Sequence, residues 1–257
     1  MKSILTIFGI FLNTLIYSKC GNSGINVFPT KTEINKNSIF LIEGFASSQK
    51  IITLLNKDYK VYLQSGNQKI NLKVTETLVG DFQLTQAVLK PEFPLEIGKE
   101  YILKIDNLPK YETINKFYNY NISSKPIIYK VTPDVDIEKP IITKKPYELK
   151  KSYISYGCGP EVNVIFSFLA NDSSQLLVKT KFKNLVTNNI TTYYILPKDN
   201  KLSVGHGMCS GAFKYDNNMA YEVEFNFMDS SGNITKWDNE GIKFTKPTEA
   251  NLDDEEE

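Results

Sequence analysis

The sequence predicts an all-β protein of two tandem antiparallel β-sandwiches that follow an N-terminal signal peptide. Three observations lead to this prediction. Apolar and polar residues alternate with a period of two along most of the chain after residue 24, long helical stripes of apolar residues do not occur there, and a polar connector bounded by prolines divides the chain near its middle. With 257 residues, 41% of them hydrophobic, the chain is long enough for two domains that each bury a core.

The N-terminal segment has the composition of an export signal. Lys2 supplies a positive charge, and the mostly apolar stretch from Ile4 to Tyr17 is shorter than the roughly 20 residues that span a bilayer. We therefore predict that residues 1–20 are a signal peptide and that the mature protein is exported, whether periplasmic, on the outer surface or secreted. A buried N-terminal strand or helix is the alternative.

Cys20 raises the further alternative of a lipoprotein. A lipoprotein signal places an apolar residue and two small residues before the lipidated cysteine, whereas Lys19 directly precedes Cys20 in this chain. Lipidation of Cys20 thus departs from the usual pattern and is kept as an alternative to free secretion. A membrane partner is expected only through such a lipid anchor.

The strands expected in the first half are short and amphipathic. Residues 59–63 and 69–74 are predicted strands, and the turn between them at residues 65–68 contains the glycine and asparagine that hairpin turns favour. Tyr101 begins another alternating strand. The aliphatic side chains of the second strand share one face: Ile70, Leu72 and Val74.

A polar, acid-rich stretch between two prolines separates the halves, and five consecutive acids end the chain. The predicted organisation is a signal peptide at 1–20, a first sandwich at 24–133, a connector at 134–137, a second sandwich at 138–247 and an acidic disordered tail at 248–257. Docking of the tail on a basic partner is the alternative to a solubilising role.

The second half alternates as regularly as the first. A loop at 229–233 reads as a hairpin turn between two strands, with Gly232 or Asn233 at a positive φ angle. The alternative of a calcium loop lacks the acidic pattern of an EF-hand. Two strands carry large apolar residues on one face: Val162, Val164, Phe166 and Phe168, then Tyr221, Val223, Phe225 and Phe227.

A tyrosine opens a late strand in each half, at Tyr101 and at Tyr221, and Leu95 and Gly98 precede the first of these. A tyrosine at this place in a sandwich can hydrogen-bond back to the preceding corner. With Phe28-Pro29 and the run from Ser38 to Phe45, the first half resembles bacterial Ig-like domains of secreted and surface proteins.

The second half resembles a fibronectin-III-like or Ig-like module of the same exported proteins. The resemblance rests on residues 156–160, 205–211 and 229–235. It implies stalks, adhesion modules and spacers, and it carries no catalytic residues over to this chain.

Cys158 and Cys209 lie in glycine-flanked turns of the second half, and an exported chain permits disulfides. We predict a structural bond between them, which would stabilise the fold by about 4 kcal/mol in the chain-entropy model. Two free thiols are the alternative.

Composition excludes several classes of partner and site. All thirty basic residues are lysine against 29 acids, so neither strong positive charge nor arginine is available for nucleic acid. His206 is the only histidine, so neither a blue-copper site with Met208 and Cys209 nor a multi-histidine site is expected, and we predict no metal or cofactor. Ser210 lies near His206 in sequence, but such adjacency does not build a catalytic triad.

The predicted function is therefore non-catalytic: an exported structural, adhesion or interaction module whose partner is a protein or glycan at the cell surface. The alternative is a carbohydrate-binding or glycan-uptake accessory surface protein, which would use Trp237, Tyr193 and Tyr194 as stacking platforms. A hydrolase on a sandwich scaffold, with clustered acids or with His206 facing a serine, is the third class.

Overall fold

The computed structural model describes residues 23–118, 126–217 and 219–249, and in this part of the chain the protein is all-β. Helical structure there is limited to a 3-10 turn (Ala46–Ser48) and the short α1 (Gln49–Thr53), as the alternating pattern predicted. The predicted signal peptide at 1–20, including Cys20, lies outside the described residues, as does the tail beyond residue 249.

Strands β1–β9 form the N-terminal half, a sheet of nine strands in the order β2-β9-β7-β4-β5-β6-β3-β1-β8. Their bounds are β1 (Gly24–Phe28), β2 (Glu33–Ile34), β3 (Phe40–Phe45), β4 (Val61–Ser65), β5 (Gln68–Val79), β6 (Leu84–Pro91), β7 (Glu100–Ile105), β8 (Ile114–Lys116) and β9 (Ile128–Val131). The predicted hairpin turn at 65–68 joins β4 to β5, with Gly66 at a φ of 55°.

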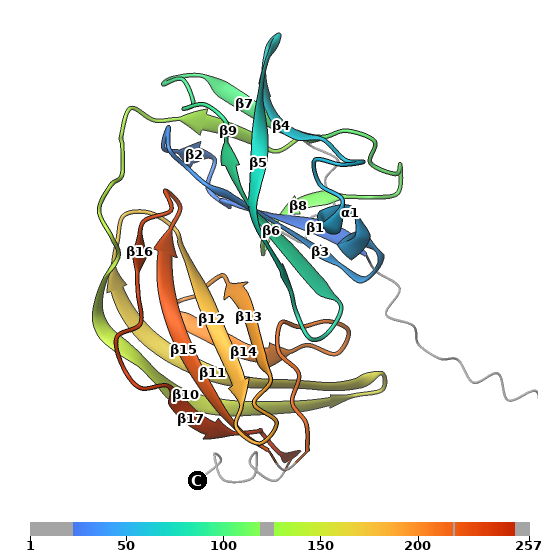
Figure 1. Cartoon of the computed structure of the whole chain (residues 1–257), viewed down its shortest axis with the longest axis vertical. Helices are drawn as coiled ribbons and strands as arrows, with labels where there is room; N and C mark the ends of the chain where they lie inside the picture. Colours follow the sequence, from blue (N-terminus) through green and yellow to red (C-terminus); the bar gives the residue numbers. More distant parts are fainter. Residues whose placement is uncertain (1–22, 119–125, 218, 250–257) are drawn as a thin grey trace, which may run out of the picture.

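The long strand β5 makes a sandwich of this sheet. Its first residues pair with β4, and from Leu72 onward it pairs with β6 (Figure 1). We call β8, β1, β3 and β6 the inner layer, and β4, β7, β9 and β2 the outer layer. The main core of this half fills the space between them, with side chains such as Ile42 and Leu89 from the inner layer and Leu63 and Tyr101 from the outer layer.

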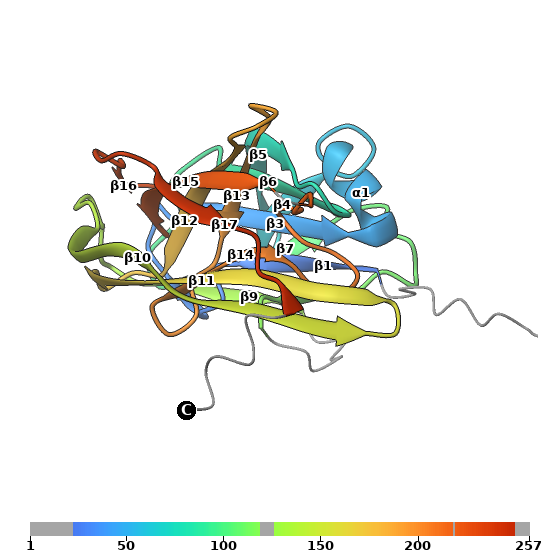
Figure 2. The same ribbon diagram turned by 90° about the horizontal axis from the view of Figure 1, so that it is seen from below.

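Strands β10–β17 form the C-terminal half and lie in two sheets, β10-β11-β14 and β13-β12-β15-β16, with β17 also on β15 (Figures 1 and 2). We call the second of these sheets the contact layer. The bounds are β10 (Ile141–Tyr156), β11 (Gly159–Asn171), β12 (Leu176–Asn184), β13 (Ile190–Ile195), β14 (Lys201–His206), β15 (Ala220–Asp229), β16 (Ile234–Thr235) and β17 (Ile242–Thr245).

An aromatic core lies between these two sheets, and the strand faces predicted from alternation build it. The four predicted apolar side chains of β11 and the four of β15 are all buried there, including an edge-to-face pair of Phe166 and Phe225 with ring centroids 5.3 Å apart. The loop at 229–233 is the predicted hairpin turn, in which the Asp229 carboxylate accepts the backbone N–H groups of Ser231 and Asn233 and Gly232 has a φ of 87°.

Both tyrosines that open a late strand hold the preceding corner, as predicted. The Tyr101 hydroxyl accepts the N–H of Glu96 at 3.2 Å, and the Tyr221 hydroxyl accepts the N–H of Asp216 at 2.6 Å and donates to its carbonyl at 3.3 Å. Both rings are fully buried. These hydroxyls fix the loops that enter β7 and β15, so a similar device recurs in both halves.

A third apolar cluster joins the halves. It contains Phe28, Leu41 and Val88 from the inner layer and Leu177, Tyr194 and Met228 from the contact layer, together with Ile39. The inner layer is therefore covered on both faces, which explains why β3 and β6 are buried almost continuously instead of on alternate residues.

Removing the corner hydroxyls tests their role in the fold. Tyr101→Phe leaves the N–H of Glu96 without its partner and should lower the free energy of unfolding by about 1 kcal/mol, and Tyr221→Phe, which loses two contacts, by about 2 kcal/mol. Urea unfolding measures both, with Tyr156→Phe as the exposed control, expected within about 0.5 kcal/mol of wild type. Equal stabilities for all three variants would contradict the corner role.

Candidate functional site: the cleft between the two halves

A row of polar side chains crosses the inner layer on the face that meets the C-terminal half. Strand pairing places Asn115 of β8 beside Asn26 of β1, Asn26 beside Glu43 of β3, and Glu43 beside Gln86 of β6. Because residues paired across adjacent strands project to the same face of a sheet, the four side chains share one side. One end of this row is buried under the contact layer, and the other opens toward solvent.

Glu43 is the charged member of the row and is 8% exposed. The Tyr193 hydroxyl donates to one carboxylate oxygen at 3.0 Å, and the Asn26 amide donates to the other at 3.4 Å. Burial raises the pKa of the Glu43 carboxyl from 4.5 to about 7, although hydrogen bonds from Tyr193, Asn26 and Gln86 oppose the rise. Glu43 thus carries a carboxyl that titrates near neutrality at the junction of the halves.

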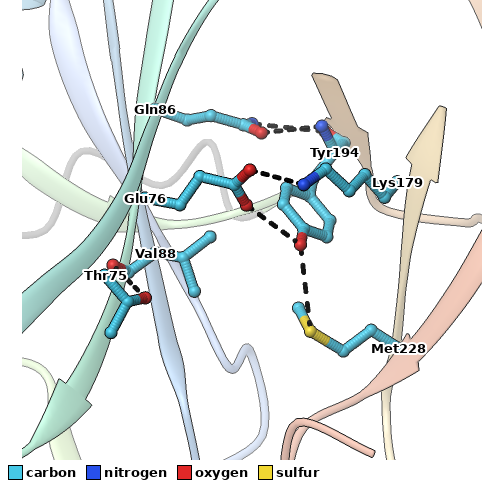
Figure 3. Close-up of polar contacts among 7 residues, drawn as sticks. All are labelled: Thr75, Glu76, Gln86, Val88, Lys179, Tyr194 and Met228. Carbon is cyan, nitrogen blue, oxygen red and sulfur yellow. Dashed lines mark hydrogen bonds and ion pairs between the residues drawn. The ribbon is translucent and has the colours of Figure 1, made fainter. Parts of the chain in front are cut away.

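Gln86 also pairs with backbone across the junction (Figure 3). Its amide nitrogen donates to the Tyr194 carbonyl at 3.2 Å, and its amide oxygen accepts the Tyr194 N–H at 2.7 Å. Both hydrogen bonds are buried, and the Gln86 side chain is 0% exposed. The side chain therefore completes the hydrogen bonding of β13 across the junction, as another strand would.

A bulge in β5 brings a second carboxylate to the junction. The register shifts between Val74 and Glu76, and the extra residue Thr75 bonds the Val88 carbonyl at 3.1 Å. Simple alternation would place Glu76 on the core face with Val74, but the bulge turns it toward the contact layer.

Glu76 then meets two residues of the C-terminal half (Figure 3). It forms an ion pair with Lys179 and accepts the Tyr194 hydroxyl at 3.3 Å, and the same hydroxyl contacts the Met228 sulfur at 4.0 Å. Lys179 also lies 5.5 Å from the centroid of the Tyr194 ring. Since Glu76 and Lys179 are each about one-third exposed, their ion pair adds little stability, and the buried amide pair is the stronger contact.

The open end of the polar row lines a cleft of about 740 Å³ between the halves. The N-terminal half contributes Asn26, Glu43, Tyr111, Asn115 and Tyr118, among others. The C-terminal half contributes residues 193–196 of β13 and the loop after it, with Ser203, Gly205, Ser210 and Ala212. The cleft thus combines amides, hydroxyls and aromatic rings from both halves.

The predicted stacking platform is wrong for Tyr193 and Tyr194, which are 1% and 6% exposed. The sequence correctly placed their rings on opposite faces of one strand: Tyr193 packs in the C-terminal core and Tyr194 in the junction cluster. Both faces of β13 are covered because the N-terminal half sits on the contact layer. Neither ring therefore offers a flat face to a sugar.

Trp237 lies apart from the cleft. Its ring is half-buried and packs edge-on against Phe225 with centroids 6.0 Å apart, and its indole N–H donates to the Glu240 carbonyl at 3.2 Å. It borders a smaller pocket of about 390 Å³ that includes Ile142 and Phe227. Trp237 therefore does not share a pocket with Tyr193 and Tyr194.

The predicted bond between Cys158 and Cys209 is not formed, because Cys158 carries a free thiol. Cys158 lies in the turn between β10 and β11, and Cys209 follows β14. A disulfide requires a narrow range of Cα separations and Cβ directions. Position in glycine-flanked turns of one half does not fix either quantity, which is why the sequence argument failed.

His206 is the last residue of β14. Its ring nitrogen Nδ1 lies 2.9 Å from the Gly207 carbonyl, and the ring packs edge-on against Phe82 of the N-terminal half at 5.7 Å. Within residues 23–118, 126–217 and 219–249, no group of three or more His, Cys, Asp and Glu side chains is arranged to hold a metal ion. The same part of the chain contains no helix long and apolar enough to cross a membrane.

The polar row was missed by the sequence analysis although the sequence contains a signal for it. Glu43 interrupts the otherwise apolar run from Ile39 to Phe45, and charged residues are rarely buried without a partner. A continuous apolar run indicates a strand covered on both faces. The two features together predict a buried carboxyl on β3, but its partners lie far away in sequence.

Comparisons with known proteins give only weak likenesses. No family model matches the chain, and no curated protein matches it in sequence. Among solved structures, the chain is similar to a pullulanase complexed with maltotriose from Anoxybacillus sp. LM18-11 (10% identity, 80% of this chain and 24% of that chain, TM-score 0.25). It is also similar to the N-terminal part of the bacterial S-layer protein SbsC (12%, 87% and 44%, 0.25) and to the tandem Ig repeats of Dlar (10%, 88% and 97%, 0.23).

The chain spans about a quarter of the length of the pullulanase chain that it matches. The TM-scores are too low to assign this chain to any of these families. The fold that the structure establishes is therefore the all-β one described above.

Truncating Gln86 tests the amide pair. Gln86→Ala leaves the N–H and carbonyl of Tyr194 buried without partners, so the free energy of unfolding should fall by about 2–4 kcal/mol. Urea unfolding at pH 7 provides the measurement, and Gln68→Ala, at an exposed glutamine of β5, is the control with an expected change below about 0.5 kcal/mol. A small, equal effect of both substitutions would show that the pair does not hold the junction.

The raised pKa of Glu43 predicts that the free energy of unfolding depends on pH. The folded chain binds a proton at Glu43 more tightly than the unfolded chain, so the contribution of this group to stability is full below pH 4.5 and is lost as the pH rises to about 7. Relative to Glu43→Gln, wild type should lose about 3 kcal/mol across that range. Urea unfolding at pH 4.5 and pH 8 measures the difference.

The control for this experiment is Glu92→Gln, at an exposed carboxyl just after β6, which should retain the pH slope of wild type. If Glu43→Gln and wild type lose stability in parallel between the two pH values, the carboxyl is not held in the buried state described here.

Proposed function

We propose that this chain is an exported, non-catalytic surface protein of two tandem Ig-like β-sandwiches, with domains at 24–133 and 138–247. It acts as a structural or interaction module, presenting one rigid two-domain surface to a protein or glycan partner at the cell surface. The observation that carries the proposal is the buried junction, in which apolar packing and the Gln86–Tyr194 amide pair hold the two halves together.

The junction supports this function because it removes the freedom that a connector alone would leave. Interfaces between tandem domains are usually mobile unless they are large and apolar. Here the connector is itself held, since the carbonyl of Asp136 accepts the side-chain amides of Asn37 and Asn233 at 2.8 and 3.1 Å. A module with a fixed angle between its domains suits a spacer or a presenting surface.

Two features support the Ig-like assignment of each domain. Each half is a two-layer β-structure around its own core, and each has a tyrosine corner. Export is supported by the charge of Lys2 and the apolar stretch from Ile4 to Tyr17.

Export and surface exposure are tested on intact cells that produce the full chain. Mild proteolysis of intact cells, followed by mass spectrometry, should release peptides of this protein, and its mature N-terminus should lie near residue 20. The proposal would be overturned if this protein keeps residues Met1 to Tyr17 and is protected from the protease until the cells are lysed. A known cytosolic protein of the same cells, which must stay intact during the proteolysis, provides the lysis control.

A further inference from the structure

We propose that the cleft between the halves binds a neutral carbohydrate, such as the terminal sugars of a glycan, between the tyrosines at its mouth and the amides of the polar row. This site rests on the proposed role as a surface module and narrows its partner to one ligand class, a neutral glycan.

The dimensions of the cleft suit such a ligand. Its volume of about 740 Å³ lies within the range of about 300–1,000 Å³ that is usual for small-molecule sites. Such sites are common where two domains meet, and they combine aromatic surface with a few polar groups that orient the ligand. Both kinds of group line this cleft, and they come from both halves.

Two tyrosines provide aromatic faces at the cleft. Tyr111 is 74% exposed and Tyr118 is 48% exposed, so both rings are accessible, unlike those of Tyr193 and Tyr194. The Tyr118 hydroxyl donates to the Leu196 carbonyl at 2.6 Å, which anchors its ring against the C-terminal half. The face of an aromatic ring is electron-rich and attracts the positively polarised C–H groups of a sugar face.

Two asparagines provide hydrogen-bonding groups beside the rings. Asn26 donates one amide N–H to Glu43, and Asn115 donates one to Thr113 at 3.4 Å. An asparagine side chain has two donors and an acceptor oxygen, so each retains both kinds of group for a ligand hydroxyl. Ser203 and Ser210 border the cleft from the C-terminal half and add hydroxyls.

The charges at the cleft favour a neutral ligand over an anionic one. Lys116 is the only lysine among the described residues that line the cleft. Its ammonium group donates to the Lys31 carbonyl at 3.2 Å and lies 4.8 Å from the centroid of the Tyr129 ring, and its burial lowers its pKa. The Glu43 carboxyl is bonded to Tyr193 and Asn26. The Lys198 ammonium lies 5.9 Å from the centroid of the Tyr118 ring. Both ammonium groups are therefore engaged with a carbonyl or a ring instead of being held free for an anionic ligand.

The test uses the purified full chain on an array of immobilised glycans that end in glucose, galactose, mannose, N-acetylglucosamine or sialic acid. We expect binding to at least one neutral terminus. Tyr111→Ala and Asn115→Ala should each weaken that binding by about tenfold, equivalent to about 1.4 kcal/mol. Tyr156→Ala, at a tyrosine of β10 that is 47% exposed and lies outside the cleft, is the matched control and should bind as wild type.

Several outcomes would overturn the proposal: binding of no neutral glycan, binding of sialylated glycans alone, or binding that both cleft variants retain in full. Thermal unfolding checks that each variant folds, and because the Tyr111 side chain is largely exposed, Tyr111→Ala keeps the test valid if Asn115→Ala is unstable. The array uses purified protein, so its result is independent of whether the chain is exported.

Discussion

The structure depends on one buried contact, in which the Gln86 side chain takes both hydrogen-bonding groups of the Tyr194 backbone. Strand β13 would otherwise bury an unpaired N–H and carbonyl against the inner layer, at a cost that apolar packing alone would have to offset. Because the amide satisfies both groups, the contact layer can lie directly on the inner layer. Backbone hydrogen bonds between Phe82 and Gly211 and between Ile39 and Ser230 also join the halves.

The same placement creates the carboxyl with a raised pKa and the cleft. Glu43 lies next to Gln86 across the strands, and covering Gln86 covers Glu43 as well, so its carboxyl is removed from water and depends on Tyr193 and Asn26. At the other end of the row, Asn26 of β1 and Asn115 of β8 line the cleft together with Tyr118. One row of polar side chains thus has two parts. Its buried members hold the domains together, and its exposed members line the cleft that we propose binds a ligand.

Much of the fold could be predicted from local sequence, since a strand covered on one face alternates and a corner tyrosine lies a few residues from its partner. The faces of β11 and β15 and the corners at Tyr101 and Tyr221 are examples. The junction could not be predicted in this way. Gln86 and Tyr194 are 108 residues apart, and a bulge at Thr75 reverses the face on which Glu76 projects. The error at Cys158 has the same origin, because pairing at a distance depends on geometry that spacing does not fix.

Hydrogen exchange at the backbone amide of Tyr194 tests the central claim most directly. If Gln86 holds this amide in a permanent junction, its exchange should require an opening nearly as costly as that of Phe225 in the C-terminal core. Gln86→Ala should then raise the exchange rate of Tyr194 far more than that of Phe225. Rapid exchange of Tyr194 in the wild-type protein, with Phe225 protected, would show that the halves separate readily and would contradict the account.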